Sequence, residues 1–186
     1  MEERENILKI LEGTLDAIKK NDSFRLKDLS NQTIHTASIT QDPENIALAV
    51  IIYSISKIIE RPMYREKEGW TKFYQGVIKE VTHSINAIKE KDEKHLKIHI
   101  EGLRDRIERV SGRLKKYIEE VFIKARINKA SRIYEHGISM GKTADLLGIT
   151  LWDLAGYAGQ TGIGDVNLGK TMEVRNRIKI AEEIFK

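Results

Sequence analysis

The chain has no cysteine, only two prolines among its 186 residues, and no apolar stretch long enough to cross a bilayer. The absence of cysteine excludes disulfide bonds and thiolate metal sites. The longest apolar stretch, residues 46–59, is interrupted by polar side chains, whereas a membrane-spanning helix needs about 20 apolar residues. The acidic N-terminal segment lacks the pattern of a signal peptide. We therefore expect a soluble, cytoplasmic protein without a membrane partner.

The residue types that are abundant favour helices. Charged residues make up 32% of the chain and apolar residues 40%. With so little proline, this composition predicts an all-α fold. The formal net charge of +4 is uneven, because residues 1–62 carry −2 whereas residues 63–123 and 124–186 carry +3 each. A mildly basic C-terminal part is compatible with nucleic-acid binding, but it is also common in proteins that bind no nucleic acid.

Three segments before residue 62 are candidates for an N-terminal helical bundle. Residues 3–20 have apolar side chains at helical spacing. Residues 43–60 follow the helix-start sequence Asp42-Pro43-Glu44 and are apolar nearly all round. They predict a helix that is buried on every side or that enters a dimer interface. Residues 24–41 are ambiguous, because their serine and threonine side chains compete with the backbone for hydrogen bonds.

The clearest periodicity lies between residues 95 and 123. Apolar residues recur there in alternating steps of four and three: Leu96, Ile100, Leu103, Ile107, Val110, Leu114, Tyr117 and Val121. This heptad seam predicts one helix of roughly 40 Å, at 1.5 Å per residue. With an amphipathic helix over 64–90 it would form a long antiparallel hairpin, or it would pair with a second copy of the chain. The helix 43–60 and the heptad seam are thus the candidate homodimer surfaces.

Residues 126–160 have the pattern of a helix-turn-helix. Two helices that cross through a tight turn need a small residue at the crossing and a residue tolerant of positive φ at the turn. Ala144 and Gly148 fill these positions, while Ser139 and Thr150 are suited to cap the two helices, Thr150 with Asp153 three residues on. Apolar residues surround the turn: Leu147, Ile149, Leu154 and Tyr157. We divide the chain into a helical bundle and dimerisation region, 1–123, and a helix-turn-helix module with a C-terminal helix, 124–186.

The run RIYEHGISMGKTADLLGITLWDLAGYAGQTGI resembles a family of small prokaryotic helix-turn-helix proteins of the UPF zero-one-seven-five type, some of which are considered antitoxins. The matching residues are Tyr134, Gly137, Ser139, Gly141, Lys142, Ala144, Leu146, Leu147, Gly148, Ile149, Thr150 and Trp152. The resemblance is confined to residues 126–163 and does not include the long N-terminal region. It implies a helix-turn-helix fold for this segment and an antitoxin-like role.

Binding to double-stranded DNA is the leading functional interpretation, as a dimeric transcriptional regulator or an antitoxin-like protein without enzymatic activity. The candidate contacts are Lys142, Thr150, Trp152, Asp153, Tyr157 and Gln160, together with the outlying basic residues Arg126, Lys129, Arg132, Lys170, Arg175 and Arg177. However, the second helix of the motif, LWDLAGYAG, contains no Lys, Arg, Asn or Gln, which are the usual base-reading side chains. A helical adaptor whose C-terminal module binds a protein partner is the alternative.

Two further patterns have simpler explanations. Residues 164–171, GDVNLGKT, match the P-loop expression, but that loop needs a preceding strand in a sheet domain. His95 and His99, with Asp92 one turn earlier, have a spacing that can bind a metal. No further ligand is evident beside them, and a solvated helix flank explains them. We therefore expect no catalytic residue, no metal and no cofactor.

Overall fold

The structure is a computed structural model that describes residues 2–40, 43–110, 114–135 and 138–161. These residues form eight α-helices and one short 3-10 turn: α1 (Glu2–Lys20), α2 (Ser23–Thr40), α3 (Pro43–Ile59), η1 (Pro62–Tyr64), α4 (Trp70–Lys89), α5 (Glu93–Glu108), α6 (Lys115–Glu135), α7 (Met140–Leu147) and α8 (Leu151–Thr161). The predicted all-α class is confirmed.

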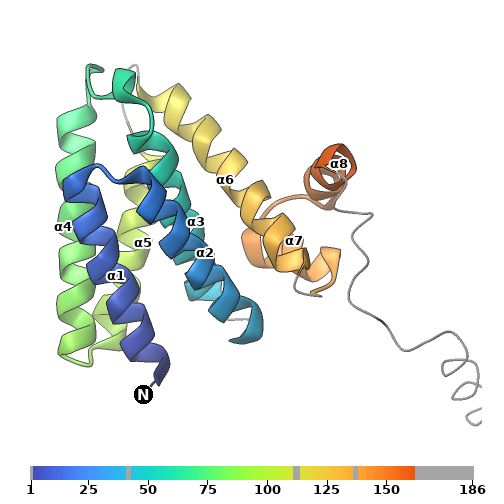
Figure 1. The fold of residues 1–186 in the computed structure, drawn as a ribbon, viewed down its shortest axis with the longest axis horizontal. Coiled ribbons are helices and arrows are strands. Elements are labelled where there is room, and N and C mark those ends of the chain that lie inside the picture. The colour runs from blue at the N-terminus through green and yellow to red at the C-terminus, as the bar shows by residue number, and fades with distance from the viewer. Residues whose placement is uncertain (1, 41–42, 111–113, 136–137, 162–186) are drawn as a thin grey trace, which may run out of the picture.

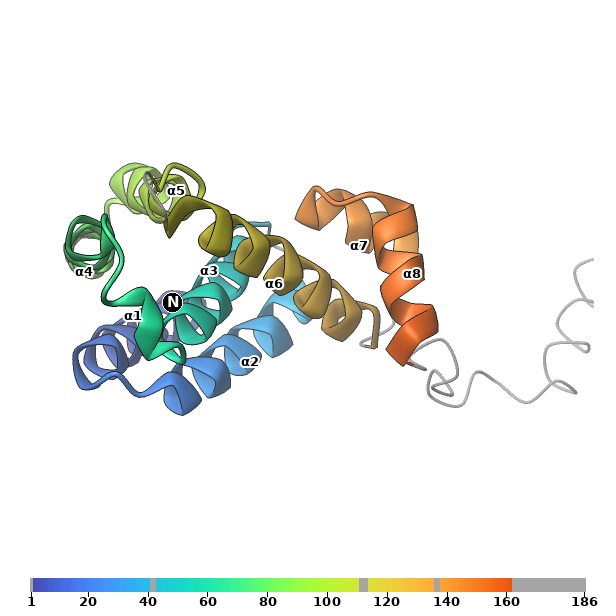
Figure 2. The ribbon, with the colours of Figure 1, turned by 90° about the horizontal axis from the view of Figure 1, so that it is seen from above.

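The helices are arranged as a bundle with a smaller unit at its side. Helices α1 to α5 stand next to one another, and α6 slants along one side of them toward α7 (Figure 1). At its far end α6 meets α7 and α8, which lie to one side of the bundle when it is seen from above (Figure 2). The candidate boundary at residue 124 falls in the middle of α6. The uninterrupted helix α6 therefore packs both on the bundle and on α7 and α8. We call α6, α7 and α8 together the C-terminal unit.

Helix α3 is the centre of the bundle. It contacts α2, α5, α6 and α7. Its isoleucines are buried all round the helix: Ile46, Ile51, Ile52, Ile55, Ile58 and Ile59. This agrees with the all-round apolar sequence, which requires cover on every side. Among the described residues, no helix is long and apolar enough to cross a membrane.

The ambiguous segment 24–41 is helical as α2. Its hydroxyl side chains bond to main-chain carbonyls and do not break the helix. Ser30 Oγ donates to the carbonyl of Ala49 on α3 at 2.7 Å, and Thr33 Oγ1 donates to the carbonyl of Leu29 at 2.8 Å. These buried hydroxyl groups bond to carbonyl oxygens and do not take the place of the backbone hydrogen bonds of α2. The serine and threonine side chains are therefore compatible with the helix.

The predicted helix 64–90 begins later than expected. Residues 62–64 form the 3-10 turn η1, and α4 starts only at Trp70. Gly69, immediately before α4, has a φ of 92°, a left-handed conformation that an α-helix does not contain. The prediction of a helix from residue 64 is therefore wrong for its first turns, where the chain instead forms η1 and reaches α4 through the left-handed Gly69.

The predicted single helix over 95–123 is wrong, because the chain forms two helices there. Helix α5 ends at Glu108, where the amide of Arg109 donates to the carbonyl of Asp105, and α6 begins at Lys115. The heptad seam is nevertheless buried over most of its length, against helices of the same chain. Tyr117 is the exception: it is 43% exposed, and the neighbouring Ile118 is buried in its place. The two candidate dimer surfaces are thus covered from within the chain.

Lys129 lies inside the bundle, which corrects its prediction as a surface cation. Its side chain is fully buried, and it donates from Nζ to Oδ1 of Asn31 at 2.8 Å and lies 4.3 Å from the centroid of the Tyr53 ring. Burial of the ammonium group, together with the nearby positive charges of Arg132 and Lys27, lowers the pKa of Lys129 to about 7. Spacing explains the position: Ala125 and Ile133, four residues before and after Lys129, are also fully buried on this face of α6.

The buried lysine makes stability depend on pH. We expect the free energy of unfolding to rise from pH 7 towards pH 10, by up to about 1.4 kcal/mol per pH unit. In this range the unfolded chain binds a proton that folded Lys129 has lost. Below pH 7 both states hold that proton, so the contribution of Lys129 is constant.

Urea unfolding in steps of one pH unit between pH 6 and pH 9 measures this dependence. The variant Lys129→Met removes the titrating group and keeps the apolar stem, so its free energy of unfolding should rise less with pH than that of the wild-type protein. Equal slopes in the two proteins would show that Lys129 is not the group responsible.

Candidate functional site

The C-terminal unit holds most of the residues that the sequence nominates, and it is built on well-formed helix caps. Ser139 caps α7 by accepting from the amide of Lys142 at 3.3 Å. Gly148 ends α7 with a φ of 56°, and the amide of Ile149 donates to the carbonyl of Ala144 at 3.0 Å. These are the cap and the left-handed glycine that the sequence predicts.

Helix α8 begins with a reciprocal cap between Thr150 and Asp153. The amide of Asp153 donates to Oγ1 of Thr150 at 3.1 Å, while the Thr150 hydroxyl donates to the Asp153 carboxylate at 2.6 Å. The amide of Thr150 also faces the same carboxylate, at 3.4 Å. Both side chains predicted as DNA contacts are therefore engaged in holding the start of α8.

Arg126 fastens the turn between α7 and α8 to α6. Its Nε donates to the carbonyl of Leu147 at 2.8 Å, and its Nη2 bonds to the carbonyls of Leu147 and Gly148. A guanidinium at the C-terminus of α7 satisfies carbonyls that have no partner within the helix, and it also offsets the negative end of the helix dipole. Ala144 and Leu154, only 3% and 1% exposed, complete the contact of α7 and α8 with the core.

The first turn of α8 leaves two large apolar side chains in solvent. Trp152 is 86% exposed and Leu151 is 51% exposed. We call this pair the α8 edge. Both residues precede the buried Leu154 in a helix whose start is fixed by the Thr150 cap. The side chains at the α8 edge thus lie outside the core on a well-anchored helix.

The other residues nominated for DNA binding are spread widely. Lys142 on α7 and Arg132 on α6 are exposed. Lys129 is buried, and the half-buried Arg126 uses its guanidinium to bond to carbonyls at the end of α7, so neither side chain is positioned as a phosphate contact would require. The remainder lie in α8 or after it: Tyr157 and Gln160 belong to α8, whereas Lys170, Arg175 and Arg177, the loop 164–171 and the expected last helix lie outside the described residues.

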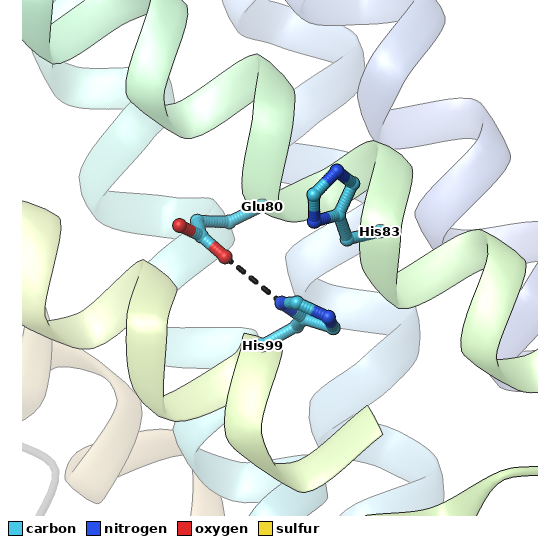
Figure 3. Close-up of side chains that lie close together, drawn as sticks. All are labelled: Glu80, His83 and His99. Atoms are coloured by element: carbon cyan, nitrogen blue, oxygen red, sulfur yellow. Dashed lines mark hydrogen bonds and ion pairs between the residues drawn. The ribbon is translucent and has the colours of Figure 1, made fainter. Parts of the chain in front are cut away.

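A second cluster of functional groups lies on the bundle, between α4 and α5. Figure 3 shows Glu80 and His83 on α4 and His99 on α5, with the Glu80 carboxylate directed at His99 and the His83 ring close by. Nδ1 of His99 is 3.0 Å from Oε2 of Glu80, and the rings of His83 and His99 are 4.9 Å apart between centroids. All three side chains are half-buried. The sequence interpretation noted His99 but missed Glu80 and His83.

Glu80 and His83 could have been recognised in the sequence only together with the histidines of the next helix. Glu80 and His83 are three residues apart and share one face of α4, just as His95 and His99 share one face of α5. The two faces meet because the turn between the helices is short, and Asp92 sets the first residue of α5 by accepting from the amide of His95 at 3.0 Å. The spacing of Glu80 and His83, considered together with that of His95 and His99 after a short turn, would have indicated the cluster.

Comparisons of the chain with protein-family models, with curated proteins and with solved structures found no match.

The left-handed glycine between α7 and α8 should be needed for stability. We expect Gly148→Ala to lower the free energy of unfolding by about 1 kcal/mol, because an L side chain is strained at this φ. The added Cβ would also lie 2.8 Å from Nη2 of Arg126. Urea unfolding measures the change.

Gly141→Ala is the matched control in the same helix. A Cβ at Gly141 meets nothing within 4 Å, so alanine should raise the free energy of unfolding by about 0.5–1 kcal/mol through its higher helix propensity. Changes of the same sign at both positions would contradict the proposed role of the left-handed turn.

Proposed function

We propose that this chain is a non-enzymatic binding protein whose C-terminal unit is a helix-turn-helix that docks on a partner protein through the α8 edge. The observation that carries the proposal is the exposure of Leu151 and Trp152, two consecutive residues at the start of α8. Tryptophan is among the side chains most enriched at the energetic centres of protein interfaces. Burying such a ring against a partner removes a large apolar area from water.

The chemistry of the α8 edge favours a protein over DNA. Neither Leu151 nor Trp152 carries the amide or guanidinium groups that read base edges, and the carboxylate of Asp153 would repel phosphates. Two of the nominated cations, Arg126 and Lys129, serve the interior of the fold. The exposed apolar pair therefore fits a partner with an apolar pocket better than it fits the polar groove of a duplex.

The support beneath the α8 edge lowers the cost of binding. The Thr150 cap fixes the start of α8, and Arg126 ties the preceding turn to α6. Because α6 continues into the bundle, the two exposed side chains are carried on a helix that is already ordered. Less conformational entropy is lost when a preorganised surface meets its partner.

Duplex DNA is the second candidate, as the ligand of a transcriptional regulator or antitoxin-like protein. The observation in its favour is the crossing of α7 and α8, with Ala144 buried at the crossing and Gly148 at the turn, as helix-turn-helix units require. Lys142 and Arg132 are exposed on the same unit and would contact phosphates. Apolar contact between Trp152 and a thymine methyl would be the base-directed interaction.

Replacing the exposed tryptophan tests the leading proposal. We expect Trp152→Ala to weaken binding of the partner that co-purifies with the tagged full-length chain by at least about tenfold, because the loss of an interface tryptophan removes a hot spot. The free energy of unfolding should change by less than about 0.5 kcal/mol, since the ring is 86% exposed. Quantitative co-purification and urea unfolding measure the two effects.

Phe24→Ala is the matched control for this experiment. Phe24 is 82% exposed on α2 and is equally apolar, but it is not part of the C-terminal unit. Its replacement should leave partner binding unchanged. If Trp152→Ala retains the partner as well as Phe24→Ala does, the α8 edge is not the docking surface.

A mobility-shift assay separates the DNA candidate from the leading proposal. If the C-terminal unit binds DNA, a duplex from the upstream region of its own gene is shifted at low salt. The double variant with Lys142→Ala and Arg132→Ala then binds less tightly, with a shallower salt dependence by about 0.9 log units per lost phosphate contact. The leading proposal predicts no such shift, and a shift that depends on these two cations would replace it with DNA binding.

A further inference from the structure

We propose that Glu80, His83 and His99 form a binding site for a divalent transition-metal ion, with Zn²⁺ as the reference ion, that links α4 to α5. The potential ligand atoms of the three side chains all lie within 4.8 Å of one another. Two imidazoles with one carboxylate are a ligand set that proteins use for zinc, and they leave a coordination position for water. This inference is independent of the α8 edge and of the proposed docking function.

The distances suit an ion that replaces a proton. Nδ1 of His99 and Oε2 of Glu80 share a hydrogen bond of 3.0 Å. In a tetrahedral zinc site with bonds of 2.0–2.1 Å, neighbouring ligand atoms are about 3.4 Å apart. These two atoms need to move apart only slightly to hold the ion between them. The third ligand, His83, would have to move closer, since one ligand atom of each of the three residues lies within 4.8 Å of the others. Imidazole ligands select ions such as zinc, cobalt or nickel over magnesium and calcium, which prefer oxygen.

Two glycines make room for the polar side chains between the helices. A Cβ at Gly102 on α5 would lie 3.0 Å from Oε2 of Glu80, and a Cβ at Gly76 on α4 would lie 3.0 Å from Cδ of Arg106. The carboxylate therefore rests against the bare backbone of the opposite helix, directed at His99 (Figure 3). A side chain at position 102 would require the Glu80 carboxylate to shift by a few tenths of an ångström.

Arg106 holds the carboxylate without blocking it. Nη2 of Arg106 donates to Oε1 of Glu80 at 3.3 Å, which leaves Oε2 on the side of His99. Burial tends to raise the pKa of Glu80, but the hydrogen bonds from His99 and Arg106 outweigh it and lower the pKa. A partner on the second oxygen is the kind of outer contact that orients metal ligands.

The two histidines of the cluster face one surface cavity, whereas Glu80 lines a neighbouring cavity. A surface cavity of about 210 Å³ is lined by His83 and His99 and extends to His95, Asp92 and Glu90. An ion could enter from this cavity, and its open position would face it. His95, whose ring centroid is 6.5 Å from that of His99, is paired with Asp92 and lies at the outer end of the cavity. It is therefore a neighbour of the proposed site and not one of its three ligands.

Calorimetric titration of the full chain with Zn²⁺ tests the inference. One ion per chain is expected to bind, and the midpoint of thermal unfolding should rise with Zn²⁺ because the ion binds only the folded pairing of α4 with α5. Magnesium should give no response at the same concentration. Glu80→Gln and His83→Ala should each weaken Zn²⁺ binding by at least about tenfold. His35→Ala on α2 is the control and should bind as the wild-type protein does.

Histidine ring signals in the NMR spectrum of the wild-type protein give a second measurement that needs no variant to fold. One equivalent of Zn²⁺ should shift the signals of His83 and His99 and leave those of His35 in place. Binding that survives both ligand variants, or that is lost in His95→Ala while His83→Ala retains it, would overturn the assignment. In that case the contacts among Glu80, His99 and Arg106 only hold the two helices together.

Discussion

The fold depends on the burial of one helix. Helix α3 is apolar on all sides, and burying each isoleucine side chain contributes about 1.5–3 kcal/mol. Its buried isoleucines alone therefore contribute about as much as the whole net stability of a typical domain, which is about 5–15 kcal/mol. No single neighbour could cover such a helix. The chain surrounds α3 with α2 and α5 and with α6 and α7, which follow much later in the sequence.

This requirement joins the bundle to the C-terminal unit. Because α6 must cover α3, it cannot serve as a loose linker, and α7 and α8, which pack on α6, are held in a fixed place. This arrangement buries a charged residue, because Lys129 lies on the face of α6 that covers the bundle. Its ammonium group donates to Asn31 and lies over the ring of Tyr53. Burial does not explain the exposure of Leu151 and Trp152, and we assign this pair a binding role because the two residues are consecutive and stand on the C-terminal unit.

Much of the fold could be predicted from the sequence, where local signals and burial agree. The all-round apolar character of α3 predicted its burial, and Ser139, Gly148 and Thr150 predicted the caps of α7 and α8. The break between α5 and α6 was missed because the heptad seam continues across it. Gly112, whose low helix propensity opposes a continuous helix there, was the available signal. The cluster of Glu80 with His99 depends on the register of two helices, which local patterns do not determine.

Native-state hydrogen exchange of the full chain tests the central claim, that the burial of α3 holds the C-terminal unit in place. Amides in the middle of α3 and amides of α6 between Ala125 and Ile133 should exchange only through the same global unfolding, with the same dependence on denaturant. Exchange of the α6 amides at low denaturant, while α3 remains protected, would show that the C-terminal unit opens independently and would contradict this account.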